Sequence, residues 1–139
     1  MDVLIDTNVI IDIAQSREPF VHLARKILNL EQLRLCATAS AVTDVYYLQR
    51  KHAGNSSARA FLGDLFNLFH IIEVTEADCR RALMLFINDY EDALQAHCAD
   101  RAKCSYIITR NAKHYDGSKV PALTPEQFLE EWNKSHAQP

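Results

Sequence analysis

The sequence predicts an α/β fold: a three-layer α/β/α sandwich around a parallel sheet of four or five strands. Short runs rich in β-branched residues alternate along the chain with longer segments whose apolar residues recur at helical spacing. This alternation favours parallel strands joined by right-handed crossovers, with helices on both faces. The chain has 139 residues, 48% of them hydrophobic, and only 3 glycines and 4 prolines. We therefore expect residues 1–139 to form a single domain.

In the first half of the chain we expect strands at residues 3–5 and 33–37, and helices at residues 8–15, 19–30, 39–52 and 57–68. The strands are short apolar runs, VLI and LRLCA. Pro19 is acceptable in the first turn of its helix because that turn leaves its N–H groups unpaired. Thr38 and Ser40 are candidates to cap the helix at 39–52, and Gly54 begins the break before the next helix.

In the second half we expect strands at residues 69–74, 105–109 and 120–123, and helices at residues 76–87, 89–103 and 124–134. Thr75 is placed to cap the first of these helices. Asp89 is placed to cap the second, with Asp92 at its third position. Thr124 followed by Pro125 is a typical start for the last helix.

The composition excludes several classes of protein. Fifteen basic residues against 18 acidic ones give a net charge of −3, so no overall basic field indicates nucleic-acid binding. No apolar run approaches the roughly 18 residues of a membrane-spanning helix, and the N-terminus does not read as a signal peptide. We therefore expect a cytoplasmic protein that does not enter the membrane. The 4 cysteines form no C-x-x-C pair and are interpreted as reduced core residues.

Acidic and polar residues follow several of the expected strands. Asp6 stands between the first strand and its helix, in LIDTNVII, although ionised carboxylates are rarely buried without a partner. Asp44 lies in the helix after the second strand, Asp92 early in the helix before the fourth, and Asn111 just after that strand. In parallel sheets ligands bind beyond the carboxyl ends of the strands. These side chains converge at one edge if the first, second and fourth strands are neighbours.

Three ionised carboxylates at close range repel one another unless a cation lies between them. Oxygen ligands favour Mg²⁺ or Mn²⁺ over Zn²⁺, and such ions suit the hydrolysis of phosphodiesters. Simpler interpretations remain open: Asp6 as a helix cap, Asp44 as a solvated acid, Asp89 as a cap and Glu91 as an exposed side chain.

Four segments, LIDTNVII, TASAVTDVYYL, DYEDALQAHCA and YIITRNAKHY, stand in this order along the chain. Together they resemble the motifs of PIN-domain ribonucleases, in particular the small VapC-like toxins of type II toxin–antitoxin pairs. The resemblance extends over essentially the whole chain. It implies a PIN-like fold, an Mg²⁺- or Mn²⁺-dependent endoribonuclease activity on RNA, a homodimer and a small antitoxin partner.

The resemblance also assigns roles by position. Asp6 matches the first acidic metal ligand of the family and Asp92 the third. Asp44 stands where the family usually has Glu, and Asn111 where it usually has Asp. The implied catalytic set is therefore Asp6, Asp44, Asp92 and Asn111, with Asp6, Asp92 and Asp44 on the metal. Asn111 still offers a carbonyl oxygen but carries no charge.

Asn8, Arg110 and Lys113 are the expected substrate-binding residues. Asn8 matches a small polar residue that fixes the first ligand or a water on the metal, and the two cations follow the fourth strand, where phosphates would approach. A solvated face is the simpler interpretation of both basic runs, Arg110 with Lys113 and His114, and residues 50–52. Tyr46 and Tyr47 are interpreted as packing residues, in the core or between subunits.

Three rival functions are weighed against this hypothesis. A haloacid-dehalogenase-type phosphatase needs a second Asp two residues after the first, but Asn8 stands there. A response-regulator receiver needs an acidic pair after the first strand, where Asp6 stands alone. A non-catalytic PIN domain that binds RNA or protein stays open because Asn111 replaces an acid.

Overall fold

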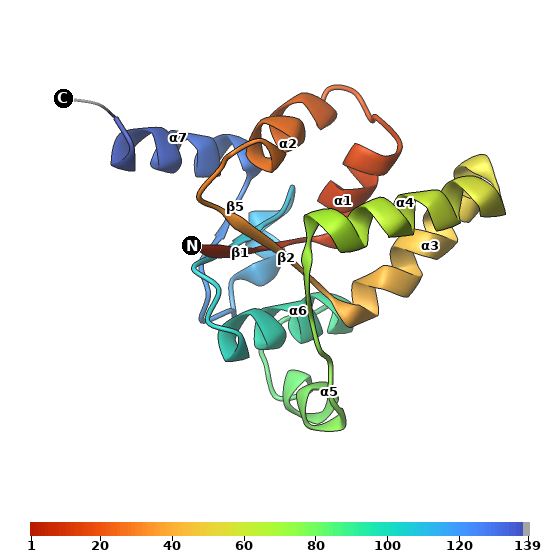
Figure 1. The fold of residues 1–139 in the computed structure, drawn as a ribbon. Helices are drawn as coiled ribbons and strands as arrows, with labels where there is room; N and C mark the ends of the chain where they lie inside the picture. The colour runs from red at the N-terminus through yellow and green to blue at the C-terminus, as the bar shows by residue number, and fades with distance from the viewer. Residues whose placement is uncertain (138–139) are drawn as a thin grey trace.

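The computed structural model describes residues 1–137 as a five-stranded parallel sheet with helices on both faces, which confirms the expected α/β/α sandwich (Figure 1). Residues 138–139 of the expected domain lie outside the described part. The strands are β1 Asp2–Ile5, β2 Arg34–Thr38, β3 His70–Ile72, β4 Tyr106–Ile108 and β5 Ala122–Leu123. The helices are α1 Thr7–Ala14, α2 Val21–Leu28, α3 Ala39–Ala53, α4 Asn55–Leu68, α5 Glu76–Ala82, α6 Tyr90–Arg101 and α7 Pro125–Ser135, with a 3₁₀ helix, η1, at Ala112–Tyr115.

The strand order, β3-β2-β1-β4-β5, puts β1 at the centre with β2 and β4 beside it. Leu4 of β1 is paired with Cys36 of β2, and Ile5 is paired with Ile108 of β4. The three strands therefore end at about the same level. The residues that follow them lie at one edge of the sheet, as the expected convergence of acidic residues requires.

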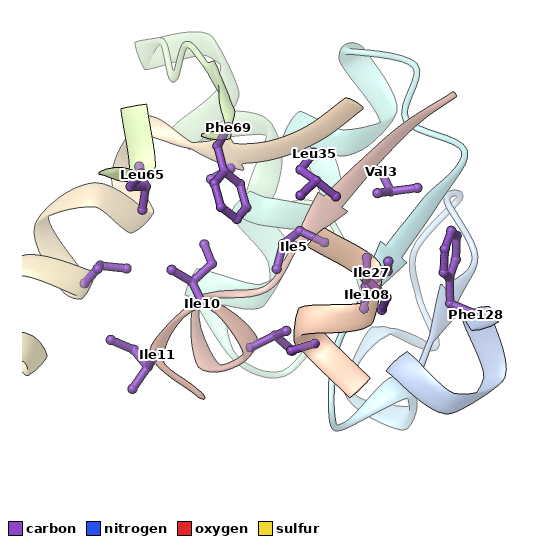
Figure 2. Close-up of a cluster of buried hydrophobic side chains, with 14 residues drawn as sticks. Val3, Ile5, Ile10, Ile11, Ile27, Leu35, Leu65, Phe69, Ile108 and Phe128 are labelled. Carbon is purple, nitrogen blue, oxygen red and sulfur yellow. The ribbon is translucent and has the colours of Figure 1, made fainter. Parts of the chain in front are cut away.

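The sheet is buried on both faces, which explains its continuous apolar strands. Val3 and Ile5 point to the face covered by α1, α2, α4 and α7, whereas Leu4 points to the face covered by α5 and α6 (Figure 1). Each buried aliphatic side chain contributes about 1.5–3 kcal/mol relative to an exposed one. Figure 2 shows the first face, where strand side chains meet those of the helices, among them Ile10, Ile27, Leu65 and Phe128.

The helix expected at residues 76–87 is wrong beyond Ala82, where α5 ends. The next three residues continue as tight turns, with each N–H bonded to the carbonyl three residues earlier. Leu83 and Phe86, expected on an apolar helix face, are 73% and 98% exposed. Ile87 returns to the core at 8% exposure. The apolar spacing of this segment therefore does not correspond to one buried helix face.

The expected helix caps are confirmed. Thr38 accepts a hydrogen bond from the backbone of the first turn of α3, and Thr75 and Thr124 form capping boxes on α5 and α7. Asp89 Oδ1 accepts the N–H of the third residue of α6 at 3.0 Å. The 3₁₀ helix η1 was not expected from the sequence, because four residues are too few for a periodic signal.

Within residues 1–137, no helix combines the length and the apolar character needed to cross a bilayer. The cysteines form no disulfide in this part of the chain. As expected, Cys36, Cys98 and Cys104 are buried, whereas Cys79 is half-buried.

Candidate active site

A cleft of about 650 Å³ opens at the carboxyl edge of the sheet, beyond β1, β2 and β4. It brings together all four residues of the expected catalytic set. Its lining residues are Asp6, Thr7, Asn8, Asp44, Tyr47, Leu48, Asn88, Asp89, Glu91, Asp92, Asn111 and His114. Five of them are acidic, and among residues 1–137 no lysine or arginine lines the cleft. The cleft is therefore a strongly electronegative site.

Asp6 lies at the base of the cleft, where β1 ends, and is only 4% exposed. Its carboxylate accepts hydrogen bonds from Thr109 Oγ1 at 2.7 Å and from Gln95 Nε2 at 3.2 Å. Asp6 occupies the N-cap position of α1, but its side chain makes no capping hydrogen bond. The helix-cap interpretation is therefore wrong. Two neutral donors fix the carboxylate, and no cationic side chain among residues 1–137 pairs with it.

Asp92 faces the same cleft from the first turn of α6. Tyr115 donates its hydroxyl to Oδ1 at 3.2 Å, and His114 Nδ1 lies 3.8 Å from Oδ2. Burial, followed by the nearby charges of Asp6 and Asp89, raises the pKa of the Asp92 carboxyl. Burial and repulsion between carboxylates both disfavour the charged form and so act in this direction.

Glu91 and Asp44 form the second acidic pair of the cleft. Glu91 lies at the exposed rim, as expected, and accepts a hydrogen bond from Thr7 Oγ1 at 3.2 Å. Partial burial, then repulsion by Asp44, raises the pKa of Glu91 to about 7. Asp44 is half-buried on α3 and lines the cleft. The sequence left the role of Glu91 unassigned, and its proximity to Asp44 makes it part of the acidic site.

Buried polar side chains that the sequence analysis missed connect the acids. Gln95 is fully buried on α6, and its Nε2 donates to the carboxylate of Asp6 and to the hydroxyl of Tyr115 at 3.3 Å. The Tyr115 hydroxyl in turn donates a hydrogen bond to the carboxylate of Asp92. Burial, reinforced by Asp6 and Asp92, raises the pKa of Tyr115 far above its ordinary value, so the hydroxyl stays a donor. Gln95 follows Asp92 by three positions, which was the available sequence signal.

The three expected substrate-binding residues do not all lie in the cleft. Asn8 lines the cleft. Arg110 does not: its Nε lies 3.1 Å from Oδ2 of the buried Asp12, and its guanidinium lies 4.2 Å from the ring centre of Phe20. Lys113 is exposed on η1, outside the cleft lining. The cations expected at the cleft are therefore beside it rather than in it.

The arrangement is suited to binding a hard cation, but it is not a closed ligand cage. Within residues 1–137, no three His, Cys, Asp or Glu side chains converge tightly enough to form a complete set of ligands. The donors are all oxygens, from the Asp6–Asp92 pair, the Asp44–Glu91 pair and the amide of Asn111. Mg²⁺ commonly binds through one or two carboxylates and keeps several waters, which such an open acidic cleft permits.

Comparison with known proteins identifies a family. The family model described as a PIN domain matches residues 2–113, most of the chain. No curated protein matches the sequence closely enough to serve as a relative.

Solved structures share the fold. A toxin–antitoxin complex from Klebsiella pneumoniae is similar at a TM-score of 0.69 and 23% identity, over 88% of this chain and 97% of that one. VapBC-1 from nontypeable Haemophilus influenzae has a TM-score of 0.68 at 16% identity, over 91% and 99%. Mycobacterium tuberculosis VapC20, described as a sarcin–ricin loop cleaving toxin, has a TM-score of 0.66 at 12% identity, over 76% and 86%.

Proposed function

The chain belongs to the PIN-domain family, and from this premise we propose that it is a metal-dependent endoribonuclease, the toxin of a toxin–antitoxin pair. The observation that carries the proposal is the carboxylate of Asp6. It is buried at the base of an acidic cleft, held by neutral donors and without a cationic partner in the described part of the chain. A buried charge of this kind costs several kcal/mol unless it is compensated, on the order of magnitude known for unpaired ions.

We propose that Mg²⁺ or Mn²⁺ is held by Asp6 and Asp92, with Asp44 as a further ligand, direct or through water. Asn111 lines the same cleft, and its amide oxygen would be a further donor. The oxygen donors and the raised pKa of Asp92 support this fit, because a cation would offset both the burial and the carboxylate repulsion that raise that pKa. When bound, a divalent ion supplies positive charge at phosphate oxygens and makes a water more acidic.

The chain's own residues then have distinct tasks. Thr109 and Gln95 hold Asp6 in one orientation, and Tyr115 does the same for Asp92. Because these donors are buried, the two carboxylates keep their positions whether or not a substrate is present. We assign Asp44 and Asn111 to orienting water at the phosphodiester.

We propose that Asn8, Arg110 and Lys113 contact the RNA. Asn8 reaches the scissile region from the cleft wall. Lys113 is exposed close by on η1 and approaches the backbone phosphates as a mobile cation. Arg110 keeps its contact with Asp12, so it acts from a fixed position and orders the strand end that carries Thr109 and Asn111.

Partners and location follow from the family alone. The similarity to toxin–antitoxin structures supports an antitoxin partner. We propose that this partner is a small protein that covers the cleft and presents an arginine side chain to its carboxylates. A homodimer, a cytoplasmic location and a single PIN-like domain over residues 1–139 are further parts of the proposal.

A second candidate is a PIN domain that binds RNA or a protein without cleaving it. Two observations favour it: Asn111 supplies no charge, and three acidic side chains do not converge on one point within residues 1–137. The two functions are separated by incubating a structured and an unstructured RNA with Mn²⁺, Mg²⁺ or EDTA. The ribonuclease cleaves only with a divalent ion. RNA that is bound but intact under every condition would establish the non-catalytic function.

A further inference from the structure

The outer part of α3 carries an aromatic and two basic side chains next to the acidic cleft. Tyr47 lines the cleft together with Asp44, which precedes Tyr47 by about one helical turn. Tyr47 also lines a second hollow of about 350 Å³, whose other walls are Arg50 and Lys51. The ring of Tyr47 is therefore shared by the two concavities. We call Tyr47, Arg50 and Lys51 the α3 track.

The side chains of the α3 track do not belong to the core of the fold. Tyr47 is 63% exposed, so it is not a core residue, whereas the hydroxyl of its neighbour Tyr46 is bonded to Asn55. Arg50 and Lys51 are exposed, and neither forms an ion pair or a side-chain hydrogen bond with another of residues 1–137. Figure 1 shows α3 leaving the end of β2 and running outward beside α4, away from the sheet.

We propose that the α3 track binds a single-stranded segment of the RNA substrate next to the scissile phosphate. This inference rests on the proposed ribonuclease function. Arg50 and Lys51 contact backbone phosphates, and an unpaired base stacks on Tyr47. A groove with cations along the backbone path and an aromatic ring for a base is the usual design of single-strand binding sites.

Charge complementarity favours RNA as the occupant. The cleft has five acidic side chains and no lysine or arginine among residues 1–137, so by itself it repels a polyanion. A nucleic acid that reaches it needs positive charge at its border. Arg110 is held by Asp12, so the exposed positive charge at the border comes from Lys113 on η1 and from the α3 track, which adds two cations and an exposed ring.

The positions of these residues along α3 determine the order of the proposed contacts with RNA. Asp44, Tyr47 and Lys51 are three and four positions apart, so they form one stripe along the helix. From Asp44 to Lys51 the helix rises about 10 Å. The stacked base is therefore adjacent to the acids, and the phosphate contact of Lys51 lies further out. Because Tyr47 offers a ring face rather than a base-specific pattern of hydrogen bonds, it selects unpaired bases without selecting sequence.

The test measures binding rather than cleavage. The full-length protein is kept in EDTA, where the proposed ribonuclease leaves RNA intact, and titrated against a fluorescein-labelled unstructured 12-nucleotide RNA by fluorescence anisotropy. Tyr47→Ala weakens binding by about tenfold, since stacking on one aromatic side chain is worth roughly that factor. Tyr47→Phe restores it. Arg50→Gln with Lys51→Gln lowers the slope of log affinity against log salt by about 1.4, or roughly 0.7 per lost phosphate contact.

A matched variant, Arg59→Gln with Lys119→Gln, removes two exposed charges outside the α3 track and leaves the slope unchanged. Equal slopes for the two double variants, or unchanged binding by Tyr47→Ala, would overturn the proposal. The proposal would also be overturned if Tyr47→Ala changed the mass of the particle in solution and left RNA affinity intact, because the surface would then bind protein. If wild-type protein cleaves no RNA with any metal, the proposed function fails, but these binding results still decide the role of the α3 track.

Discussion

Replacing Asp78 by alanine should destabilise the protein strongly, although Asp78 lies outside the candidate active site. The side chain is 1% exposed and connects α5 to α6. Its carboxylate accepts hydrogen bonds from Arg101 at 2.8 and 2.9 Å, from His97 at 2.9 Å and from the backbone N–H of Thr75 at 2.9 Å. Since α6 also carries Asp92, this connection helps to position the acidic cleft.

The size of the effect follows from what the substitution leaves behind. Breaking a buried ion pair by removing one partner typically costs about 3–5 kcal/mol. The Arg101 side chain is 39% exposed, so water partly replaces the lost carboxylate. We therefore expect a loss at the lower end, about 3 kcal/mol in the free energy of unfolding.

The same contact has a defined pH dependence. Burial opposes ionisation of Asp78, but the bonds from Arg101 and Thr75 outweigh it and hold the pKa of Asp78 well below its usual value of 3.8. A depressed native pKa means that the unfolded chain binds the proton first. The stabilisation is therefore complete above about pH 5 and is lost as the pH falls below the unfolded value.

Urea denaturation followed by circular dichroism at pH 7 and at pH 3.5 measures both effects. The difference between wild type and Asp78→Ala should be largest at pH 7 and shrink at pH 3.5. Asp100→Ala is the matched control, because Asp100 is an exposed acid on the same helix. A change below 1 kcal/mol at pH 7, or a difference that grows in acid, would refute the reasoning.

Three further predictions concern the cleft and its border. Glu91→Gln should raise the Tm more at pH 8 than at pH 5, because partial burial and Asp44 raise the pKa of Glu91 to about 7 and its ionised form is the unfavourable one; an equal gain at both pH values would contradict this in a thermal scan. Asn111→Asp should preserve or raise the rate of RNA cleavage in Mn²⁺, because it adds charge to the cleft; a large loss would show that the amide itself is needed. Gly117→Ala should cost about 1–3 kcal/mol in urea denaturation, because its Cβ would lie 2.5 Å from the carbonyl oxygen of Phe86; unchanged stability would mean that the 83–88 turn moves freely.

The elements that the sequence predicted are those with a strong local signal. The strand ending at Ile5 and the helix that follows it are apolar runs separated by a short polar segment. The caps Thr75 and Thr124 act through contacts within three residues, so their sequence context is sufficient to place them. The parallel direction of the strands was predicted from their alternation with helices.

The failures have a different physical origin. The turns after Ala82 place Leu83 and Phe86 in solvent, and helical periodicity does not distinguish an exposed apolar residue from a buried one. The ion pair between Arg110 and Asp12 was not predicted either, because the two residues are almost a hundred positions apart in the chain. Contacts of that separation are decided by packing and not by local pattern.

The sequence predicted the acidic residues of the candidate site, but it did not reveal the buried residues that hold them. Asp6 was identified as a carboxylate at the end of an apolar strand, and Asp44 and Asp92 as acids of neighbouring helices that match family motifs. Gln95 and Tyr115 are neutral, and apart from the three-residue spacing between Asp92 and Gln95 their local sequence carries no signal for a role in the site. Only the fold, which buries both side chains between the two carboxylates, reveals their part in the site.

The most direct measurement compares cleavage of a labelled RNA by wild-type protein, by Asp6→Asn and by Asp64→Asn, each with Mn²⁺ and with EDTA. Asp64 is an exposed acid on α4 and serves as the matched control. The proposed function predicts metal-dependent cleavage by wild type and Asp64→Asn, and none by Asp6→Asn, whose circular dichroism spectrum stays that of a folded protein. Cleavage by Asp6→Asn at the wild-type rate, or cleavage by wild type that persists in EDTA, would contradict it.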